Sequence, residues 1–301
     1  MTPSRGRLVF FGNERLVSGL PRTDAPVLRG LIAAGYDIAA VVASHSDGTS
    51  RSSRQLEVAQ VAEQHGIPVL KPTKLGESAD LLAAFKADAA VLVAYGRIIP
   101  HAIIELFPAG IINLHPSLLP RWRGPTPIET TILSGDKVAG VSIMRLSVNM
   151  DAGPIFAQAN VTVKGDETKF ELYERLSQLG TELLLNTLPQ ILDGSLTPAP
   201  QGGQGITYSR LIEKTDGTLN PVSDTAMMMT RKVRAYLGFP KSRLTIGAHD
   251  VIVTSARVAS NPDDGALVVP CAGESYLEIL ELIAPSGRPM SGEAFLRGYK
   301  E

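Results

Sequence analysis

The sequence predicts an α/β protein in which a mostly parallel sheet is followed by a small β-barrel. In the first half of the chain, short apolar runs that suit strands buried on both faces alternate with segments that carry apolar residues at helical spacing. This alternation is typical of a parallel sheet covered by helices. Beyond residue 205 the pattern changes to short strands separated by turns, which is typical of a small barrel.

The predicted sheet begins close to the start of the chain. Strands are expected at residues 7–11, 38–42, 67–70 and 89–94, and helices at 25–34, 55–64 and 78–86. Gly35 suits the left-handed residue that commonly ends a helix. The turn after the first strand, from Gly12 to Glu14, lacks the glycine spacing of a dinucleotide-binding loop, so we expect no such site.

The remaining elements lead to a division into two domains. After a strand from Ile111 we expect a helix at 127–134, a hairpin of strands 138–146 and 155–163, and a long amphipathic helix at 168–192. Glycine and proline are dense from residue 193 to 205, which marks a boundary. We therefore predict a first domain at 1–196, a linker at 197–207 and a second domain at 208–301. The second domain has an expected helix at 226–237 and strands at 244–246, 251–253, 266–269 and 277–282.

Composition limits the class of protein. A chain of 301 residues suits two domains. No segment is long and apolar enough to cross a bilayer, and the start lacks the apolar region of a signal peptide. A single cysteine, Cys271, excludes an internal disulfide and a thiolate metal cluster. We therefore expect a cytoplasmic protein with no bound metal and no membrane partner.

Charge is balanced overall but not locally. The net charge of −1 gives no support for nucleic-acid binding by the molecule as a whole. Between Thr225 and Ala248, however, the chain has basic residues and no acidic one; they are Arg231, Lys232, Arg234, Lys241 and Arg243. Such a run forms either a solvated basic face or a surface that contacts phosphates.

Asn113 and His115 stand at alternate positions at the end of an apolar run, directly before Pro116. Alternate residues of a strand point to the same face, so these two side chains project together, and the proline ends the strand. An amide can donate a hydrogen bond to a developing oxyanion, and an imidazole can carry a proton near neutral pH. The pair therefore indicates a site that handles a reacting carbonyl, unless His115 merely satisfies a neighbouring backbone group.

The residues around this pair extend it into a longer pattern. Asn113-x-His115-x-Ser117-Leu118-Leu119-Pro120 is followed along the chain by Asp151-x-Gly153. This combination resembles the formyltetrahydrofolate-dependent formyltransferases, whose signature is N-x-H-x-S-L-L-P followed by D-x-G. The extension Arg121-Trp122-Arg123-Gly124 resembles, within that family, the enzymes that act on methionyl-tRNA.

The resemblance implies a Rossmann-like formyltransferase domain and an OB-like barrel that binds the acceptor. It implies transfer of a formyl group from 10-formyltetrahydrofolate to the free amino group of methionyl-initiator tRNA, and we expect a monomer. Asn113, His115 and Asp151 would stabilise the tetrahedral intermediate of direct attack. The implied folate contacts are Tyr95, Gly96, Arg97, Ile98, Ser117, Leu118, Leu119 and Pro120. The implied nucleic-acid contacts are Arg121, Arg123, Arg231 and Arg234.

Departures from the family pattern leave other acceptors open. The polar loop at 44–53 is rich in serine and only modestly basic, with Arg51 in it and Arg54 after it, where the family has a basic loop. Leu219 and Phe239 lie near the places of family tryptophans. A sugar-nucleotide N-formyltransferase would share the same catalytic residues. A glycinamide ribonucleotide formyltransferase has a D-x-G-P-I segment, as here at 151–155, but usually lacks the second domain.

Overall fold

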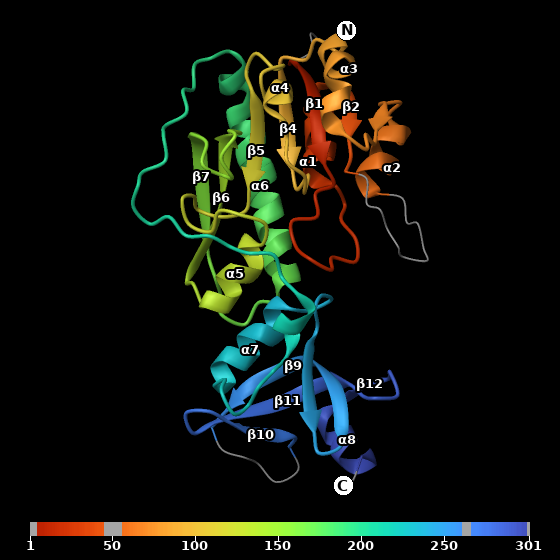
Figure 1. The fold of residues 1–301 in the computed structure, drawn as a ribbon, viewed down its shortest axis with the longest axis vertical. Coiled ribbons are helices and arrows are strands. Elements are labelled where there is room, and N and C mark those ends of the chain that lie inside the picture. Colours follow the sequence, from red (N-terminus) through yellow and green to blue (C-terminus); the bar gives the residue numbers. More distant parts are fainter. Residues whose placement is uncertain (1–4, 45–55, 261–265, 300–301) are drawn as a thin grey trace.

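The structure is a computed structural model, and it describes residues 5–44, 56–260 and 266–299. Two domains follow one another along the longest axis of the molecule, an α/β domain at the N-terminal end and a mainly β domain at the C-terminal end (Figure 1). Of the polar loop predicted at 44–53, only Ser44 is described; Arg51 and Arg54 lie outside the described residues.

The first domain is built on a seven-stranded sheet in the order β3-β2-β1-β4-β5-β6-β7. The first five strands pair in parallel, and the last two are antiparallel to their neighbours. This confirms the mostly parallel sheet. The strands are β1 (Arg7–Gly12), β2 (Asp37–Val42), β3 (Val69–Leu70), β4 (Ala89–Val93), β5 (Ile111–His115), β6 (Val138–Arg145) and β7 (Ile155–Thr162).

Helices cover both faces of this sheet, because successive residues of each central strand point to opposite sides. Leu8 and Phe10 of β1 pack into the core that also contains residues of α1, α2 and α6, whereas Val9 and Phe11 pack with residues of α3 and α4. The helices are α1 (Pro26–Ala33), α2 (Glu57–Gln64), α3 (Ala79–Ala84), α4 (His101–Ile104), α5 (Pro127–Ser134) and α6 (Lys169–Leu192). The four-residue α4 was not predicted, because it is too short to show a helical period.

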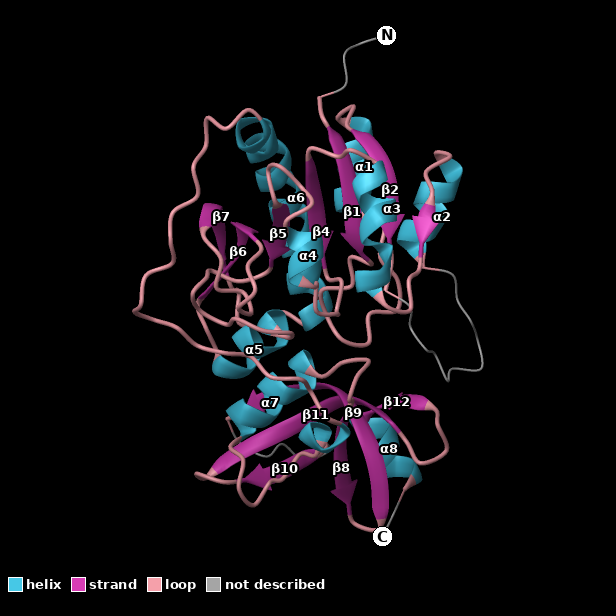
Figure 2. Cartoon of the chain, turned by 45° about the horizontal axis from the view of Figure 1, so that its top comes forward, coloured by secondary structure: helices cyan, strands magenta, loops and turns pink. Residues whose placement is uncertain are grey.

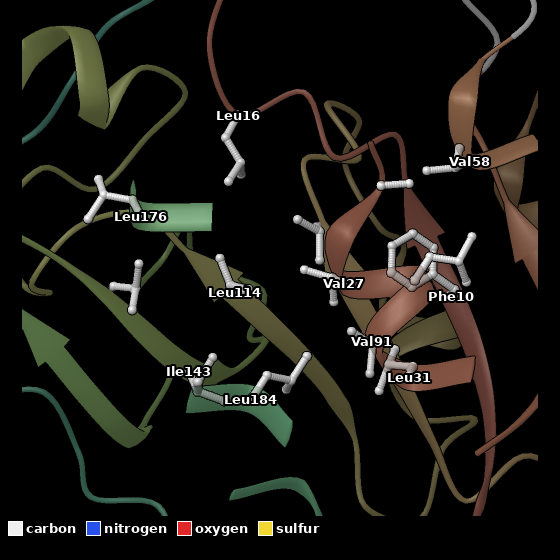
Figure 3. Close-up of a cluster of buried hydrophobic side chains, with 14 of the residues drawn as sticks. Phe10, Leu16, Val27, Leu31, Val58, Val91, Leu114, Ile143, Leu176 and Leu184 are labelled. Carbon is white, nitrogen blue, oxygen red and sulfur yellow. The ribbon is translucent and has the colours of Figure 1, made fainter. Parts of the chain in front are cut away.

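The long helix α6 has the predicted amphipathic pattern. Thr168 caps it by accepting a hydrogen bond from the Glu171 backbone N–H, and Glu171 reciprocates in a capping box. Leu176 and Leu184 meet Leu114 in the core (Figure 3). Burying each such leucine stabilises the fold by roughly 1.5–3 kcal/mol.

The second domain is an antiparallel sheet in the order β10-β11-β9-β8, with β12 paired to β11, and it has its own hydrophobic core. This agrees with the small β domain that the sequence predicts. Its elements are α7 (Ala226–Ala235), β8 (Ser242–Ile246), β9 (His249–Ala259), β10 (Val268–Cys271), β11 (Ser275–Ile283), β12 (Pro289–Ser291) and α8 (Gly292–Gly298). The sequence reading missed β12 and α8 and predicted only the most apolar part of β9.

The segment between the domains is not a free connection. It leaves the end of α6 and runs along the flank of the first domain beside β7 (Figures 1 and 2). Ala199 and Ile155 exchange two backbone hydrogen bonds of 2.8 Å. Further on, Thr207 and Ser209 pair with the loop that follows β5. The glycine and proline content prevents regular structure here, but the boundary predicted at residue 196 crosses a segment that is bound to the first domain.

A buried ionic cluster joins the domains where α6 begins. The Lys169 ammonium donates to the Phe239 carbonyl oxygen at 2.9 Å and to Ser18 Oγ at 3.0 Å. It also lies 3.6 Å from Glu129 Oε1, with both charged side chains fully buried. Phe239 belongs to the second domain and the other three residues to the first, so the cluster bonds the domains to each other.

Glu14 is a second buried acid. It follows β1, and its carboxyl group binds the first turn of α1. Its carboxyl oxygens accept hydrogen bonds from the backbone N–H groups of Val27 and Leu28 at 2.9 and 2.8 Å. Complete burial nevertheless raises the pKa of Glu14 to about 7, because an ionised carboxylate is poorly solvated there.

We expect this acid to make stability fall with rising pH. The folded state holds the proton up to a pKa of about 7 and the unfolded chain loses it near 4.5, so ionisation disfavours the folded state between those values. Denaturant unfolding should be compared for the unmodified protein and Glu14→Gln from pH 5 to pH 8. The free energy of unfolding of the unmodified protein should fall relative to the variant, by about 3 kcal/mol at most. Parallel pH profiles would show that Glu14 does not titrate in this range.

Candidate active site

Asn113 and His115 lie at the carboxyl end of β5, between β4 and β6 in the sheet. Their side chains share one face, as predicted, while Leu114 between them enters the core under α6. Asn113 is 6% exposed and His115 5%. Among the described residues, none forms a hydrogen bond with the Asn113 side chain, so its amide can donate to a ligand.

His115 is oriented by two loops. Its Nε2 lies 3.0 Å from the Trp122 carbonyl oxygen, and its Nδ1 lies 3.8 Å from Asp151 Oδ1. The imidazole therefore does bond a backbone carbonyl oxygen, as it would if His115 had only a structural role. The other ring nitrogen, however, faces the Asp151 carboxylate at ion-pair distance, which favours the positive charge of an imidazolium. The structure thus brings the three predicted catalytic residues together.

Asp151 is held in place from both sides. Its φ of 46° is left-handed, a region that non-glycine residues rarely occupy. Oδ2 accepts a hydrogen bond of 2.7 Å from the Gly124 N–H, and the Asp151 carbonyl oxygen accepts one of 2.8 Å from Gln201 Nε2. A plain turn residue would need neither contact, so the carboxylate is fixed beside His115 by its surroundings.

The turn from Ser117 to Pro120 is held from beneath by the β6–β7 hairpin. Ser142 Oγ donates to the Ser117 carbonyl oxygen at 2.6 Å and accepts from the Leu119 N–H at 3.1 Å. Gln158 Nε2 donates to the Leu119 carbonyl oxygen at 2.9 Å. The sequence reading missed both supports, although Ser142 interrupts an otherwise apolar strand and could have been noticed for that reason.

The segment at residues 95–98 follows β4, which is the neighbour of β5 in the sheet. Its side chains differ in how far they are exposed to solvent. Tyr95 is buried against Phe11 in an edge-to-face contact, and no described residue forms a hydrogen bond with its hydroxyl. Gly96 is left-handed, Arg97 donates to the Thr73 carbonyl oxygen, and Ile98 is 91% exposed. Any contact of Tyr95 with a ligand would therefore come from its backbone.

The two arginines beside the site already have partners. Arg121 binds Asp136 through Nε and Nη2 at 2.8 and 2.7 Å, and it stacks over the Trp122 ring. Arg123 is buried, and its Nε and Nη2 donate to Gln201 Oε1 at 3.1 and 2.7 Å. Their roles as nucleic-acid contacts stay predictions, and Arg123 is committed to an internal bond.

The two arginines predicted on α7 lie at the domain junction. Arg231 covers Gly135, and a Cβ added at that glycine would collide with the guanidinium group unless the arginine side chain moved. Arg234 donates to the Glu167 carbonyl oxygen at 2.8 Å, and burial lowers its pKa. Helical spacing places both on one face, as expected, and that face packs toward the first domain. Their nucleic-acid role likewise stays a prediction.

Three residues between the domains complete the site and were not predicted. Gln201 binds the loop of Asp151, Thr207 Oγ1 accepts from the Trp122 N–H at 2.9 Å, and Ser209 Oγ accepts from the Thr126 N–H at 3.1 Å. Gln201 and Thr207 fall in the predicted linker and Ser209 at the start of the predicted second domain, so nothing in the sequence indicated that these polar side chains belong to the site.

Comparison with known proteins decides the family. Residues 15–188 match the formyl transferase domain, and residues 211–300 match the formyl transferase C-terminal domain. The chain belongs to the formyl transferase family. It is therefore a formyltransferase, and the resemblance seen in the Asn113 to Pro120 pattern is confirmed.

Named relatives agree along the whole chain. The methionyl-tRNA formyltransferase of Halorhodospira halophila is 35% identical, over 94% of this chain and 95% of that protein. The structure of HypX from Aquifex aeolicus in complex with tetrahydrofolic acid is similar with a TM-score of 0.66, at 16% identity over 97% of this chain and 47% of that one. The N-formyltransferase from Helicobacter canadensis, in complex with folinic acid and dTDP-3-aminofucose, has a TM-score of 0.66 at 17% identity, over 90% of this chain and 98% of that one. The two structures confirm the fold.

None of the described helices combines the length and the apolar character that crossing a membrane requires.

Proposed function

We propose that this formyltransferase transfers the formyl group of 10-formyltetrahydrofolate to the amino group of methionyl-initiator tRNA. The observation that carries the chemistry is the arrangement of Asn113, His115 and Asp151 at the end of β5. Two buried donors and one acid next to an open strand end suit attack of an amine on a carbonyl.

In the proposed mechanism, the neutral amine attacks the formyl carbon, a carbon–nitrogen bond forms, and the carbonyl electron pair moves to oxygen. Asn113 donates a hydrogen bond to that oxygen, and His115 donates its Nε2–H to it in exchange for the Trp122 carbonyl oxygen. Asp151 accepts, through a water molecule, the proton that the attacking nitrogen releases. The bond between carbon and the folate nitrogen then breaks, and that nitrogen takes up a proton, so that charge and atoms balance.

The donor would lie between the turn at Ser117 to Pro120 and the segment Gly96 to Ile98. The supports from Ser142 and Gln158 leave this turn in a fixed shape, which suits recognition of a flat ring by backbone groups. Exposed Ile98 and partly exposed Leu118 would supply apolar contact. The folate complexes of two proteins with this fold support the assignment.

The acceptor assignment rests on the second domain. The relatives named methionyl-tRNA formyltransferase match this domain as well as the first. In addition, Lys241 and Arg243, which belong to the basic run, are exposed at the start of β8. We further propose that the enzyme acts as a monomer in the cytoplasm. One chain supplies every proposed catalytic group, and a single cysteine suits a reducing compartment.

The acceptor can be identified by salt dependence. We expect efficient transfer from 10-formyltetrahydrofolate to methionyl-initiator tRNA, with kcat/KM falling steeply as salt rises, because each phosphate contact contributes roughly 0.7–0.9 to the log–log slope. Lys241→Glu with Arg243→Glu should flatten that slope. Arg297→Glu, an exposed arginine on α8, is the matched control and should not.

An amino-sugar nucleotide should be a poor acceptor in the same assay. Efficient transfer to such a sugar, together with a flat salt profile for tRNA, would replace the proposed acceptor with an amino sugar while leaving formyl transfer itself in place.

A further inference from the structure

Gln201, in the segment between the domains, uses every polar atom of its side chain within the site. Nε2 donates to the carbonyl oxygens of Asp151 and Gly153, both at 2.8 Å. Oε1 accepts from Arg123 Nε and Nη2 at 3.1 and 2.7 Å. One side chain therefore binds both loops that meet at His115.

These bonds act on the position of the Asp151 carboxylate. The left-handed backbone at Asp151 costs energy, so it persists only where neighbouring groups hold it. The two bonds from Gln201 Nε2 fasten this turn directly. The bond to Arg123 fastens the adjoining loop, whose next residue, Gly124, donates its N–H to Asp151 Oδ2 at 2.7 Å. Gln201 thus fixes the backbone of the acid and, through Arg123, the group that binds its carboxylate.

Attachment of the segment itself does not need Gln201. On one side, Ala199 and Ile155 exchange two backbone hydrogen bonds. On the other, Thr207 and Ser209 bond the loop from Trp122 to Thr126. Because the chain is held before and after residue 201, the side-chain bonds of Gln201 mainly constrain the two loops of the site.

We propose that Gln201 is a positioning residue for formyl transfer, which holds the Asp151 carboxylate against His115. The segment between the domains is then part of the active site. This inference rests on the proposed role of Asp151, and it holds whether the acceptor is a tRNA or an amino sugar.

A double-mutant cycle in the full-length protein tests the proposal, with Gln201→Ala, Asp151→Asn and both together. The measurement is steady-state formyl transfer from 10-formyltetrahydrofolate to methionyl-initiator tRNA. We expect Gln201→Ala to lower kcat by about tenfold or more, with KM for both substrates changed by about twofold or less. In the Asp151→Asn background, the same change should have little further effect, because a residue that acts through Asp151 has nothing left to position.

Two further variants sharpen the test. Gln204→Ala changes an exposed glutamine of the same segment and should keep full activity. Gln201→Glu can still accept from Arg123 but cannot donate to Asp151 and Gly153, so it should be as impaired as Gln201→Ala. Thermal unfolding of each variant should match that of the unmodified protein.

Three results would overturn the proposal: equal losses from Gln201→Ala in both backgrounds, a rise in KM with unchanged kcat, or full activity of Gln201→Glu. If Asp151→Asn itself kept near-full activity, the proposed role of Asp151 would fail along with that of Gln201. A loss in Asp151→Asn without a loss in Gln201→Ala would remove Gln201 alone.

Discussion

His115→Ala should lower kcat for formyl transfer by about 10²–10³-fold or more, with little change in KM. Removing one oxyanion donor typically has an effect of this size, and the imidazole in addition lies 3.8 Å from the Asp151 carboxylate, for which we propose a role in proton transfer. The effect should appear in kcat because the hydrogen bond to the oxyanion forms fully only in the transition state. Asn113→Ala should show a loss of similar size, since its amide has no other partner in the described structure.

The measurement is initial-rate kinetics at saturating donor and acceptor. His101→Ala is the matched control, because that histidine is exposed on α4 and pairs only with Glu105. It should leave kcat unchanged. The His115→Ala variant should unfold at the same temperature as the unmodified protein. If it also kept near-full turnover, the role of His115 would be only to bond the Trp122 carbonyl oxygen.

Lys169→Met should produce the largest loss of stability, about 3–5 kcal/mol of the free energy of unfolding. Removing one partner of a buried ion pair leaves the other without compensation. Here that partner is Glu129, one of whose oxygens already lacks a hydrogen bond to any residue that the structure describes. The Phe239 carbonyl oxygen loses its donor as well. Burial lowers the pKa of Lys169 to about 8, which shows how strongly desolvation acts on this group even beside its carboxylate.

Equilibrium unfolding in denaturant measures this loss. Lys74→Met, which removes an exposed lysine, is the control and should change stability by about 0.5 kcal/mol or less. Adding Glu129→Gln to Lys169→Met should recover part of the loss, because glutamine removes the buried charge and still accepts from Ser18. A loss below about 1 kcal/mol for Lys169→Met would show that water reaches the cluster.

The sequence predicted the placement of Asn113 and His115 well because their geometry is local. The alternation of a strand places Asn113 and His115 on one face wherever that strand lies, and Pro116 ends it. The parallel sheet was equally accessible, because strands buried on both faces leave continuous apolar runs. Helical spacing in turn predicted the amphipathic helix α6, whose buried face includes Leu176.

What the sequence could not predict depends on contacts between distant segments. Nothing local to Gln201 shows that it meets Asp151, because a segment without periodic structure carries no signal of its neighbours. The contacts of Arg234 could not be predicted from the sequence either. A basic run favours a solvated or phosphate-binding face, yet the fold turns this guanidinium toward the Glu167 carbonyl oxygen. The charge pattern of a sequence alone does not reveal which basic side chains form contacts between two domains.

The Glu14 carboxyl group also restricts which ligands the first domain can hold. In open α/β sheets, the helix N-terminus beyond a parallel strand is a ready anion site, because free backbone N–H groups point at it. At α1 those N–H groups are already bound to Glu14, which is buried. A phosphate would have to displace this buried carboxyl group from the two N–H groups. A ligand that carries a phosphate is therefore expected to bind away from the N-terminus of α1.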